Sequence, residues 1–405
     1  MVLETTILSS IEFQMSLLLF VALAGYLAAS RFNQSAVIGE ILVGIIIGPS
    51  ILGLITYTDF VKSIATMGAV VLLFVIGMEF KLKEIFNGKY GLIAFFGVIL
   101  PWIAGYYLAK GFGFDFPSAV FVAAALTATS VAITAQVLKE LNLLKEDFAK
   151  AIIGAAVIDD ILGIMSLSMS KGLATGSLSL GYVGIIFLKA IAFLVIGYLI
   201  GQFLLRNLIM KTDETKIAKR YPEFVFIFAM MIAFLYAMFA EMIGLSAIIG
   251  SFIAGVCLGS MVLKNSRHFQ EGSEFLVIIL ASVFFVSLGI LANIRELTLS
   301  TIVFMAVLTI VAIATKLIGC GVSAKMVGMK TRSALIIGVG MAPRGEVAMI
   351  IALIGLNQGI IGQNIYVSLV MMSLITTIIT PIALKYVLGK DEKNIKVNKL
   401  KIRID

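Results

Sequence analysis

Apolar stretches of about 20 residues follow one another along almost the whole chain, each long enough to cross the roughly 30 Å hydrocarbon layer of a bilayer as an α-helix. Apolar residues make up 60% of the 405 residues, charged residues only 13%, and the mean hydropathy is +1.10. Soluble domains carry about 25% charged residues, so a soluble fold is excluded. We therefore predict an all-α polytopic membrane protein with thirteen transmembrane helices. Their approximate ranges are 11–30, 35–54, 60–80, 88–110, 117–138, 148–170, 180–206, 222–242, 244–262, 273–293, 299–324, 332–356 and 364–388.

The basic residues predict how these helices are oriented in the membrane. If the connecting loops alternate between the two sides, 24 of the 31 Lys and Arg residues lie on the side of the C-terminal tail, and four lie on the other side. Basic residues concentrate in cytoplasmic loops, so this distribution predicts an N-terminus outside the cell (inner) membrane and a cytoplasmic C-terminus. Such an arrangement requires an odd number of helices, which supports the count of thirteen.

The net charge of +8 does not indicate a nucleic-acid partner. The basic residues lie in short loops and in a short tail at 391–405 rather than on one face of a domain, so membrane lipid accounts for them better. Cys257 and Cys320 fall within apolar segments and offer neither a disulfide framework nor a metal motif. We interpret His268, in a predicted cytoplasmic loop, as solvated surface, with a pH-sensing role as the alternative.

Two segments far apart in the chain share a glycine pattern. The sequence VIGEILVGIIIGP in the second predicted helix resembles IIGSFIAGVCLGS in the ninth. Because the second helix is even-numbered and the ninth odd-numbered, the match predicts two inverted six-helix repeats, with the seventh helix as linker. The alternative is that glycines recur because they let membrane helices pack closely. The glycines that match, at a constant offset of 211, are Gly39, Gly44 and Gly48 with Gly250, Gly255 and Gly259.

Inverted repeats usually bind substrate where corresponding helices are interrupted near the middle of the membrane. Proline, glycine and hydroxyl residues mark such places in the fifth and twelfth predicted helices. Pro343 lacks a hydrogen-bond donor, whereas hydroxyl groups can satisfy freed backbone groups or coordinate a cation. We therefore predict crossed discontinuous helices. The residues concerned are Thr127, Ala128, Thr129, Ser130 and Thr134 in the fifth helix and Gly338, Gly340, Pro343, Arg344, Gly345 and Glu346 in the twelfth.

Two adjacent acids, Asp159 and Asp160, lie about ten residues into the sixth predicted helix. At about 1.5 Å per residue they stand about 15 Å deep, at the centre of the bilayer. An ionised carboxylate there costs at least about 2.5 kcal/mol, and desolvation favours protonated carboxyl groups, so the pair can exchange protons for a cation. Carboxylate, hydroxyl and carbonyl oxygens suit the hard ion Na⁺, which we predict competes with protons at this pair. The alternative is a structural pair held by buried cations.

Further charged residues fall within the apolar segments. Lys316 is the expected counter-ion of one aspartate and could itself carry an exchanged proton. The alternative is that its side chain extends to the cytoplasmic surface. Arg344 and Glu346 are expected to form a buried ion pair that holds the broken helix. Glu40 and Glu79, near predicted helix ends, are interpreted as interfacial or gating charges.

Four short motifs, TATS (127–130), IDD (158–160), TK (315–316) and PRGE (343–346), together resemble the monovalent cation:proton antiporter superfamily. The chain is most similar to its paired-aspartate sodium/proton antiporters with thirteen helices, over the whole membrane domain. The resemblance implies a transporter rather than an enzyme, without a cofactor. It also implies alternating access and electrogenic exchange of one Na⁺ (or Li⁺) for two protons.

The resemblance also assigns roles to residues. It implies that Asp160 is the main ion ligand, that Asp159 pairs with Lys316, and that Thr129 and Ser130 help to coordinate the ion. The first to third and eighth to tenth helices would form a homodimerisation domain. The fourth to sixth and eleventh to thirteenth would form a mobile ion-binding core, within a single membrane domain at 1–390 that precedes the tail.

Three other functions are alternatives. Potassium/proton exchange or potassium efflux keeps the fold, although the potassium-efflux branch, which also has PRGE-like segments, commonly carries a large cytoplasmic nucleotide-binding domain that is absent from this chain. An intramembrane aspartyl protease also uses two aspartates, but adjacent residues on one helix point about 100° apart and cannot face each other across a scissile bond. A sodium-coupled symporter for an organic anion would want a larger polar pocket, and only Arg344 favours it.

Overall fold

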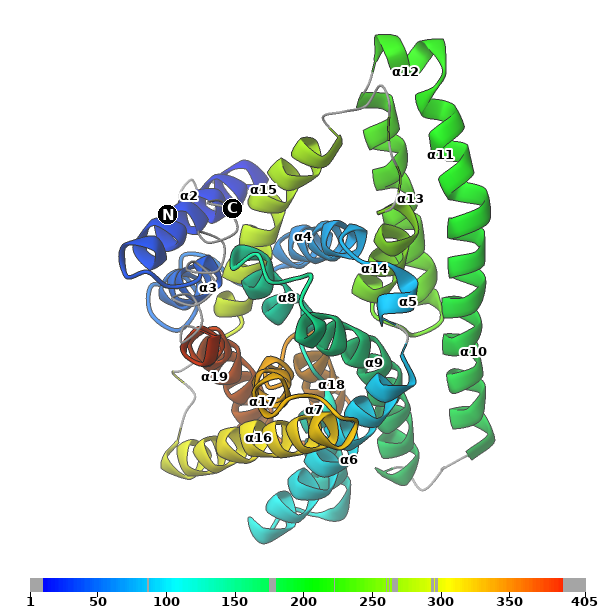
Figure 1. Cartoon of the computed structure of the whole chain (residues 1–405). Coiled ribbons are helices and arrows are strands. Elements are labelled where there is room, and N and C mark those ends of the chain that lie inside the picture. Colours follow the sequence, from blue (N-terminus) through cyan, green and yellow to red (C-terminus); the bar gives the residue numbers. More distant parts are fainter. Residues whose placement is uncertain are drawn as a thin grey trace, which may run out of the picture.

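The computed structural model describes residues 10–388, apart from 86, 175–179, 222, 260, 262, 264–268, 293–294 and 296–297. This part of the chain is helical, and no strand occurs among the described residues (Figure 1). His268 and the tail at 391–405 lie outside it. The helices are α2 (Ile11–Arg31), α3 (Ala36–Ile47), α4 (Asp59–Met78), α5 (Leu82–Ile85), α6 (Gly88–Gly111), α7 (Phe116–Thr127), α8 (Val131–Glu140), α9 (Asp147–Ala174), α10 (Leu180–Leu199), η1 (Ile200–Leu205), α11 (Arg206–Asp213), α12 (Lys216–Arg220), α13 (Glu223–Met242), α14 (Ala247–Leu258), α15 (Phe269–Ile290), α16 (Leu299–Met326), α17 (Thr331–Gly340), α18 (Glu346–Asn357) and α19 (Gln363–Leu388).

Every predicted transmembrane range contains a helix or a series of helices. Ten helical segments in the described part are long and apolar enough to cross a membrane. The second and ninth ranges were predicted too long, since α3 and α14 have only 12 residues each. Each ends at a glycine, Gly48 or Gly259, and Pro49 prevents α3 from continuing. The exact number of thirteen crossings therefore stays a prediction.

The seventh predicted helix is longer than expected. It comprises α10, the π-helical segment η1 and α11, which follow one another without a break to Asp213 along the edge of the molecule (Figure 1). The Tyr236 hydroxyl of α13 donates to the Gly197 carbonyl just before η1, at 2.6 Å. Large apolar side chains such as Leu188 and Phe203 are exposed on this helix, which is expected of a surface that faces lipid.

The other helices pack in two groups. In the first, α2, α3 and α4 contact α13, α14 and α15, and these helices occupy the upper half of Figure 1. In the second, α6, α7 and α9 contact α16, α17, α18 and α19 in the lower half. The short helix α8 touches members of both groups, α4 and α3 on one side and α9 and α19 on the other. Both breaks that were predicted from the sequence fall within the second group.

Glycine contacts in the first group repeat with the offset seen in the sequence. A Cβ atom on Gly39 would overlap the carbonyl group of Gly25, 2.7 Å from its carbon, and one on Gly250 would overlap the carbonyl group of Tyr236, 2.6 Å from its carbon. The partners Gly25 and Tyr236 are themselves 211 residues apart. This packing is expected of an internal repeat whose glycines allow close backbone approach. The inverted relation of the two copies stays a prediction.

We expect Gly39→Ala to destabilise the protein by about 1 to 3 kcal/mol, because the added methyl group must push two helix backbones apart. Gly91→Ala is the matched control, since no atom lies within 4 Å of a Cβ there, and alanine is the better helix former. Thermal unfolding in detergent should show a lower midpoint for Gly39→Ala and an unchanged or higher one for Gly91→Ala. Equal midpoints would contradict the close approach of α2 and α3.

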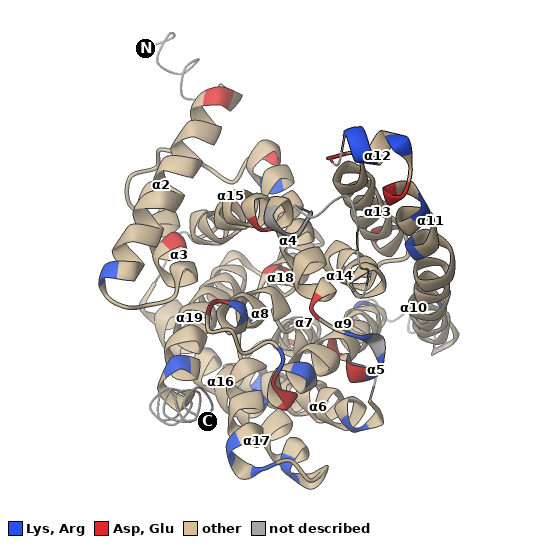
Figure 2. Cartoon of the chain, turned by 45° about the horizontal axis from the view of Figure 1, so that its top comes forward, with Lys and Arg blue, Asp and Glu red and all other residues tan. Residues whose placement is uncertain are grey.

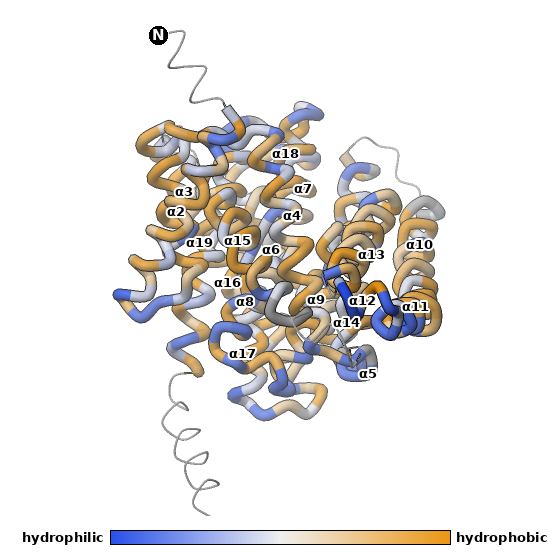
Figure 3. The backbone as a smooth tube through the Cα atoms, turned by 90° about the horizontal axis from the view of Figure 1, so that it is seen from above, coloured by the Kyte–Doolittle hydropathy of each residue, from blue (hydrophilic) through white to orange (hydrophobic). Residues whose placement is uncertain are grey.

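Charged and apolar residues occupy different parts of the helices. Lys, Arg, Asp and Glu gather mainly at helix ends and in short segments such as α5 and α12 (Figure 2). Hydrophobic residues dominate the middle of most helices, and hydrophilic residues their two ends (Figure 3). This apolar band is the arrangement of a multi-pass membrane protein.

Candidate functional site

The two predicted helix interruptions are confirmed, and they cross each other. α7 ends at Thr127 and α8 begins at Val131, whereas α17 ends at Gly340 and α18 begins at Glu346. The backbone N–H of Ser130 donates to the carbonyl of Pro343 at 2.9 Å. The hydroxyl of Thr134 donates to the carbonyl of Gly340 at 2.6 Å. Each break thus satisfies backbone groups of the other.

Hydroxyl groups of α19 form hydrogen bonds with backbone groups of the second break. The Thr377 hydroxyl donates to the carbonyl of Arg344 at 2.7 Å, and the Arg344 N–H donates to the Thr376 hydroxyl at 3.1 Å. The Ser373 hydroxyl donates to the carbonyl of Gly345 at 3.3 Å. The sequence analysis missed these residues, although the polar run in the otherwise apolar segment SLITTIIT was a signal for them.

A fully buried ion pair lies beside the crossing. Lys316 Nζ of α16 donates to Asp159 Oδ1 of α9 at 2.7 Å, and both side chains are 0% exposed. Lys316 therefore does not extend to the surface. Gly97 of α6 lies beside the pair and makes room for Cys320, because a Cβ there would be in ordinary contact, at 3.6 Å, with both charged atoms but only 2.6 Å from Cys320 Sγ. The sequence offered no signal for the role of Gly97.

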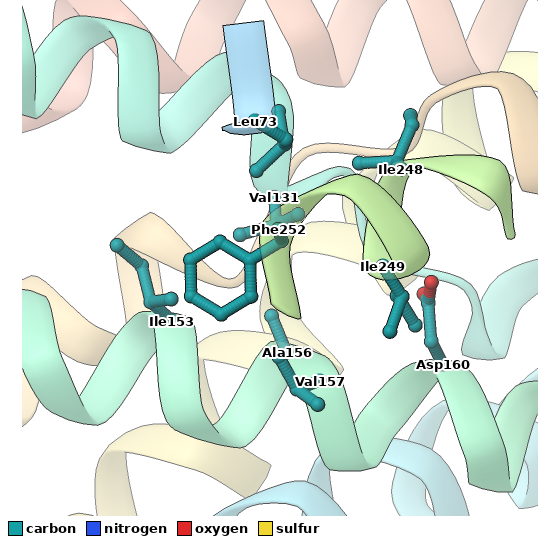
Figure 4. A pocket seen from close by; sticks show the side chains of 9 residues that line it. All are labelled: Leu73, Val131, Ile153, Ala156, Val157, Asp160, Ile248, Ile249 and Phe252. Carbon is teal, nitrogen blue, oxygen red and sulfur yellow. The ribbon is translucent and has the colours of Figure 1, made fainter. Parts of the chain in front are cut away.

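Asp160 is partly exposed and lines two pockets. The first pocket lies between the two helix groups, and Asp160 is its only charged residue, with the carboxylate directed to the side of Ile248 and Ile249 (Figure 4). The other residues that line it are Leu73, Val131, Ile153, Ala156, Val157 and Phe252. Of the two aspartates, Asp160 is thus the one whose side chain borders a pocket.

The second pocket lies at the helix crossing, and we call it the polar pocket because five of its nine lining residues have polar or charged side chains. Its lining joins Asp160 to Thr129 and Ser130 of the first break and to Glu346 of the second. The hydroxyl oxygens of Thr129 and Ser130 and one oxygen of Glu346 are buried and have no hydrogen-bond partner in the described part of the chain. Buried polar atoms normally have partners, so oxygens of this kind are suited to bind a hard cation. The remaining lining residues are Val131, Ala132, Ser246, Ile248 and Val347.

The ion pair expected between Arg344 and Glu346 does not form, because neither an ion pair nor a hydrogen bond joins these two described side chains. Arg344 is 0% exposed, and its guanidinium donates to the carbonyls of Ala342 at 2.8 Å and Ala312 at 3.2 Å. The backbone of Gly345 is not helical, with φ −130° and ψ −147°, and the broken helix offers free carbonyls that a buried guanidinium can satisfy.

Glu40 is also placed differently from the expectation. It is 3% exposed within α3 and accepts a hydrogen bond from the Ser282 hydroxyl of α15 at 2.6 Å. It is therefore an internal contact of the first helix group rather than an interfacial charge. Glu79, in contrast, lies at the end of α4 and is 3.8 Å from Lys145.

Comparison with known proteins adds to this geometry. Residues 17–390 match the family model described as sodium/hydrogen exchanger, transmembrane. The chain is 34% identical over 391 residues to the Na⁺/H⁺-K⁺ antiporter GerN of Bacillus cereus, which covers 96% of this chain and 98% of that protein. A Na⁺/H⁺ antiporter of Enterococcus hirae is 33% identical over 376 residues, 91% of this chain and 96% of that protein. The solved structure of the sodium proton antiporter MjNhaP1 of Methanocaldococcus jannaschii has a similar fold, with a TM-score of 0.67 and 16% identity over 93% of this chain and 96% of that one.

These matches decide between classes of protein. The family and the named relatives are ion transporters that use no cofactor, so the intramembrane protease is excluded. They are named as antiporters of small cations, which leaves the organic-anion symporter without support. The match of the family model extends over nearly the whole described chain. This multi-pass membrane protein therefore belongs to the sodium/hydrogen exchanger family.

Proposed function

We propose that this protein is an electrogenic antiporter that exchanges one Na⁺ or Li⁺ for two protons at Asp159 and Asp160. The observation that carries the proposal is the position of Asp160. It lines a polar pocket at the crossing of two helix breaks, next in sequence to the acid of a fully buried ion pair. The unpartnered hydroxyls of Thr129 and Ser130 in that pocket supply further oxygen ligands.

Competition for the Asp160 oxygens explains the exchange. An ionised Asp160, together with Thr129 and Ser130, binds the cation. When Asp160 takes up a proton its charge is neutralised, and the carboxyl group is a poor ligand for an alkali cation. Since the two substrates exclude each other at these atoms, binding of one cation releases one proton.

The pair of Asp159 and Lys316 accounts for the second proton. In the cation-free state Lys316 holds the proton as an ammonium and donates to Asp159 at 2.7 Å. A cation that binds at Asp160 repels this buried ammonium and favours loss of its proton to water. Two protons then leave for each cation that enters. One net charge crosses the membrane in each cycle, which couples exchange to about 2.3 kcal/mol per 100 mV.

Alternating access would use the two helix groups. The second group, with both breaks and the ion pair, is the mobile core, and the first group is the homodimerisation domain, with α10, η1 and α11 as linker. Asp160 lies where the groups meet, since α4 and α14 line the first pocket together with α8 and α9. We place the protein in the cell membrane with the N-terminus outside and the C-terminus in the cytoplasm, as the basic residues indicate.

Potassium is the second candidate cation, because some of the relatives of this chain are named as antiporters that transport K⁺. The first is GerN, named a Na⁺/H⁺-K⁺ antiporter. K⁺/H⁺ antiporter 1 of Saccharomyces cerevisiae is 28% identical over 397 residues, 91% of this chain, but these residues are only 45% of that protein. Potassium/proton exchange and potassium efflux therefore remain alternatives to sodium/proton exchange.

Liposomes with a pH-sensitive dye inside test the proposal. Liposomes loaded with Na⁺ or Li⁺ should acidify inside when the wild-type protein exchanges the cation for external protons, and K⁺ should give a much weaker response. An inside-negative potential should accelerate acidification, because two charges enter for one that leaves. Each 100 mV should shift the equilibrium constant of the exchange reaction about 50-fold, because moving one net charge across this voltage corresponds to about 2.3 kcal/mol. A response without voltage dependence would refute electrogenic exchange, and an equal response to K⁺ would favour the second candidate.

A further inference from the structure

Glu346 is a buried acid that the mechanism above does not use. It is the first residue of α18, and its Oε2 atom has no hydrogen-bond partner among the residues that the structure describes. Arg344, which could have neutralised it, donates to the carbonyls of Ala342 and Ala312 instead. Because buried carboxylate oxygens are rarely left without a partner, this atom is free to bind a ligand.

The side chains around Glu346 in the polar pocket are the proposed ion-binding groups. Asp160, Thr129 and Ser130 line the same pocket. Thr129 and Ser130 are 4% and 5% exposed, and their hydroxyl oxygens lack a partner in the described chain. Oxygens from α9, from the first break and from α18 therefore border one space.

Close contact between the two breaks holds Glu346 at this space. The Ser130 N–H donates to the Pro343 carbonyl at 2.9 Å. A Cβ atom on Gly345 would lie 2.5 Å from Ser130 Oγ and 2.6 Å from its Cβ, so only glycine permits this approach. Glu346 follows Gly345 directly and thus begins α18 against the hydroxyl residues of the first break.

Two carboxylates at one small pocket repel each other unless a cation lies between them. The buried cations nearby are committed elsewhere, Lys316 to Asp159 and Arg344 to backbone carbonyls. The N-terminus of α18 favours a negative charge on Glu346 by only about 0.3 to 1 kcal/mol. A bound monovalent cation would remove the repulsion and satisfy both acids.

We propose that Glu346 is a direct ligand of the transported cation and faces Asp160 across the polar pocket. This inference rests on the proposed function. The cation is then held by carboxylates of α9 and α18 and by the hydroxyls of Thr129 and Ser130, all from the second helix group. The ion can therefore move with that group, while the first group contributes Ser246 and Ile248 to the pocket lining. Two carboxylates favour the smaller alkali cations, Li⁺ and Na⁺, over K⁺.

Kinetics of the Glu346→Gln variant in liposomes test the inference. The KM for Na⁺ should rise at least about tenfold, which corresponds to about 1.4 kcal/mol, because one anionic ligand is lost. The maximal rate at saturating Na⁺ should stay within about twofold, because Asp160 still exchanges the proton. A residue that only holds the fold would lower the amount of active protein and the maximal rate, and would leave KM unchanged.

Two further variants make the test decisive. Glu223→Gln is the control, since Glu223 is exposed in the first turn of α13 and lines neither pocket, and its KM should equal that of the wild type. Glu346→Asp keeps the charge and withdraws it by one methylene, so its ratio of KM values for Na⁺ and Li⁺ should change at least about threefold. If Glu346→Gln does not fold, the ratio of KM values for Na⁺ and Li⁺ in Glu346→Asp is the test of the inference. A ratio equal to that of the wild type overturns the inference. A wild-type protein without any cation-driven proton movement would instead refute the proposed function.

Discussion

Asp160→Asn is expected to abolish cation-driven proton movement. The amide has nearly the shape of the carboxyl group, but it can neither bind an exchangeable proton nor supply a negative charge to the cation in the polar pocket. Mutation of a residue that only hydrogen-bonds a metal ligand typically lowers metal affinity or activity about 10- to 100-fold. Loss of the main ligand itself should therefore lower the initial rate more than about 100-fold. The liposome assay with a saturating Na⁺ gradient measures this rate directly.

A second acid provides the control for this variant. Asp59→Asn makes the same chemical change at an exposed position in the first turn of α4, and its rate should match the wild type. Thermal unfolding in detergent should show that Asp160→Asn is folded, because Asp160 is partly exposed in the pocket and loss of its negative charge leaves no ion-pair partner unpaired. A fully active Asp160→Asn protein would eliminate the mechanism.

Lys316→Met is expected to have the largest effect on stability. It leaves Asp159 fully buried without its ion-pair partner, the one hydrogen-bond donor to this side chain among the described residues, and breaking a buried ion pair typically costs about 3 to 5 kcal/mol. The double variant Asp159→Asn with Lys316→Met removes both charges and should recover most of that loss. Thermal unfolding of the wild type, the two single variants and the double variant gives the coupling energy between the residues.

The same double variant tests the origin of the second proton. If the pair of Asp159 and Lys316 carries it, the double variant should exchange one cation for one proton, and its rate should no longer respond to an imposed voltage. Lys189→Met, at an exposed position on α10, is the matched control and should keep both stability and voltage dependence. A voltage-dependent double variant would show that another group carries the second proton.

Features encoded in short stretches of sequence were predictable. The apolar segments identified the bilayer as the solvent, because about 20 apolar residues in a row have few other stable environments. Pro343 and the polar run around Thr129 marked the helix interruptions, since missing donors and free hydroxyls act within one turn of the chain. The place of Asp159 and Asp160 within one apolar helix followed from the hydropathy of α9, whereas their depth in the bilayer stays a prediction from the rise per residue.

Partners between distant segments depended on the tertiary structure. The charge of Arg344 suggested Glu346, two positions away, as its partner. The non-helical backbone at Gly345 and the free carbonyls of Ala342 and Ala312 decided its contacts instead. Likewise, only the packing of α15 against α3 brought Ser282 to Glu40.

The sequence by itself thus determined the membrane environment, the helical segments and the two interruptions, because hydropathy and backbone restriction act locally along the chain. The tertiary structure alone decided which buried charge lies beside which oxygen. A buried polar group must take its partner from whatever packs against it, and that neighbour is set by the crossing of helices far apart in the chain.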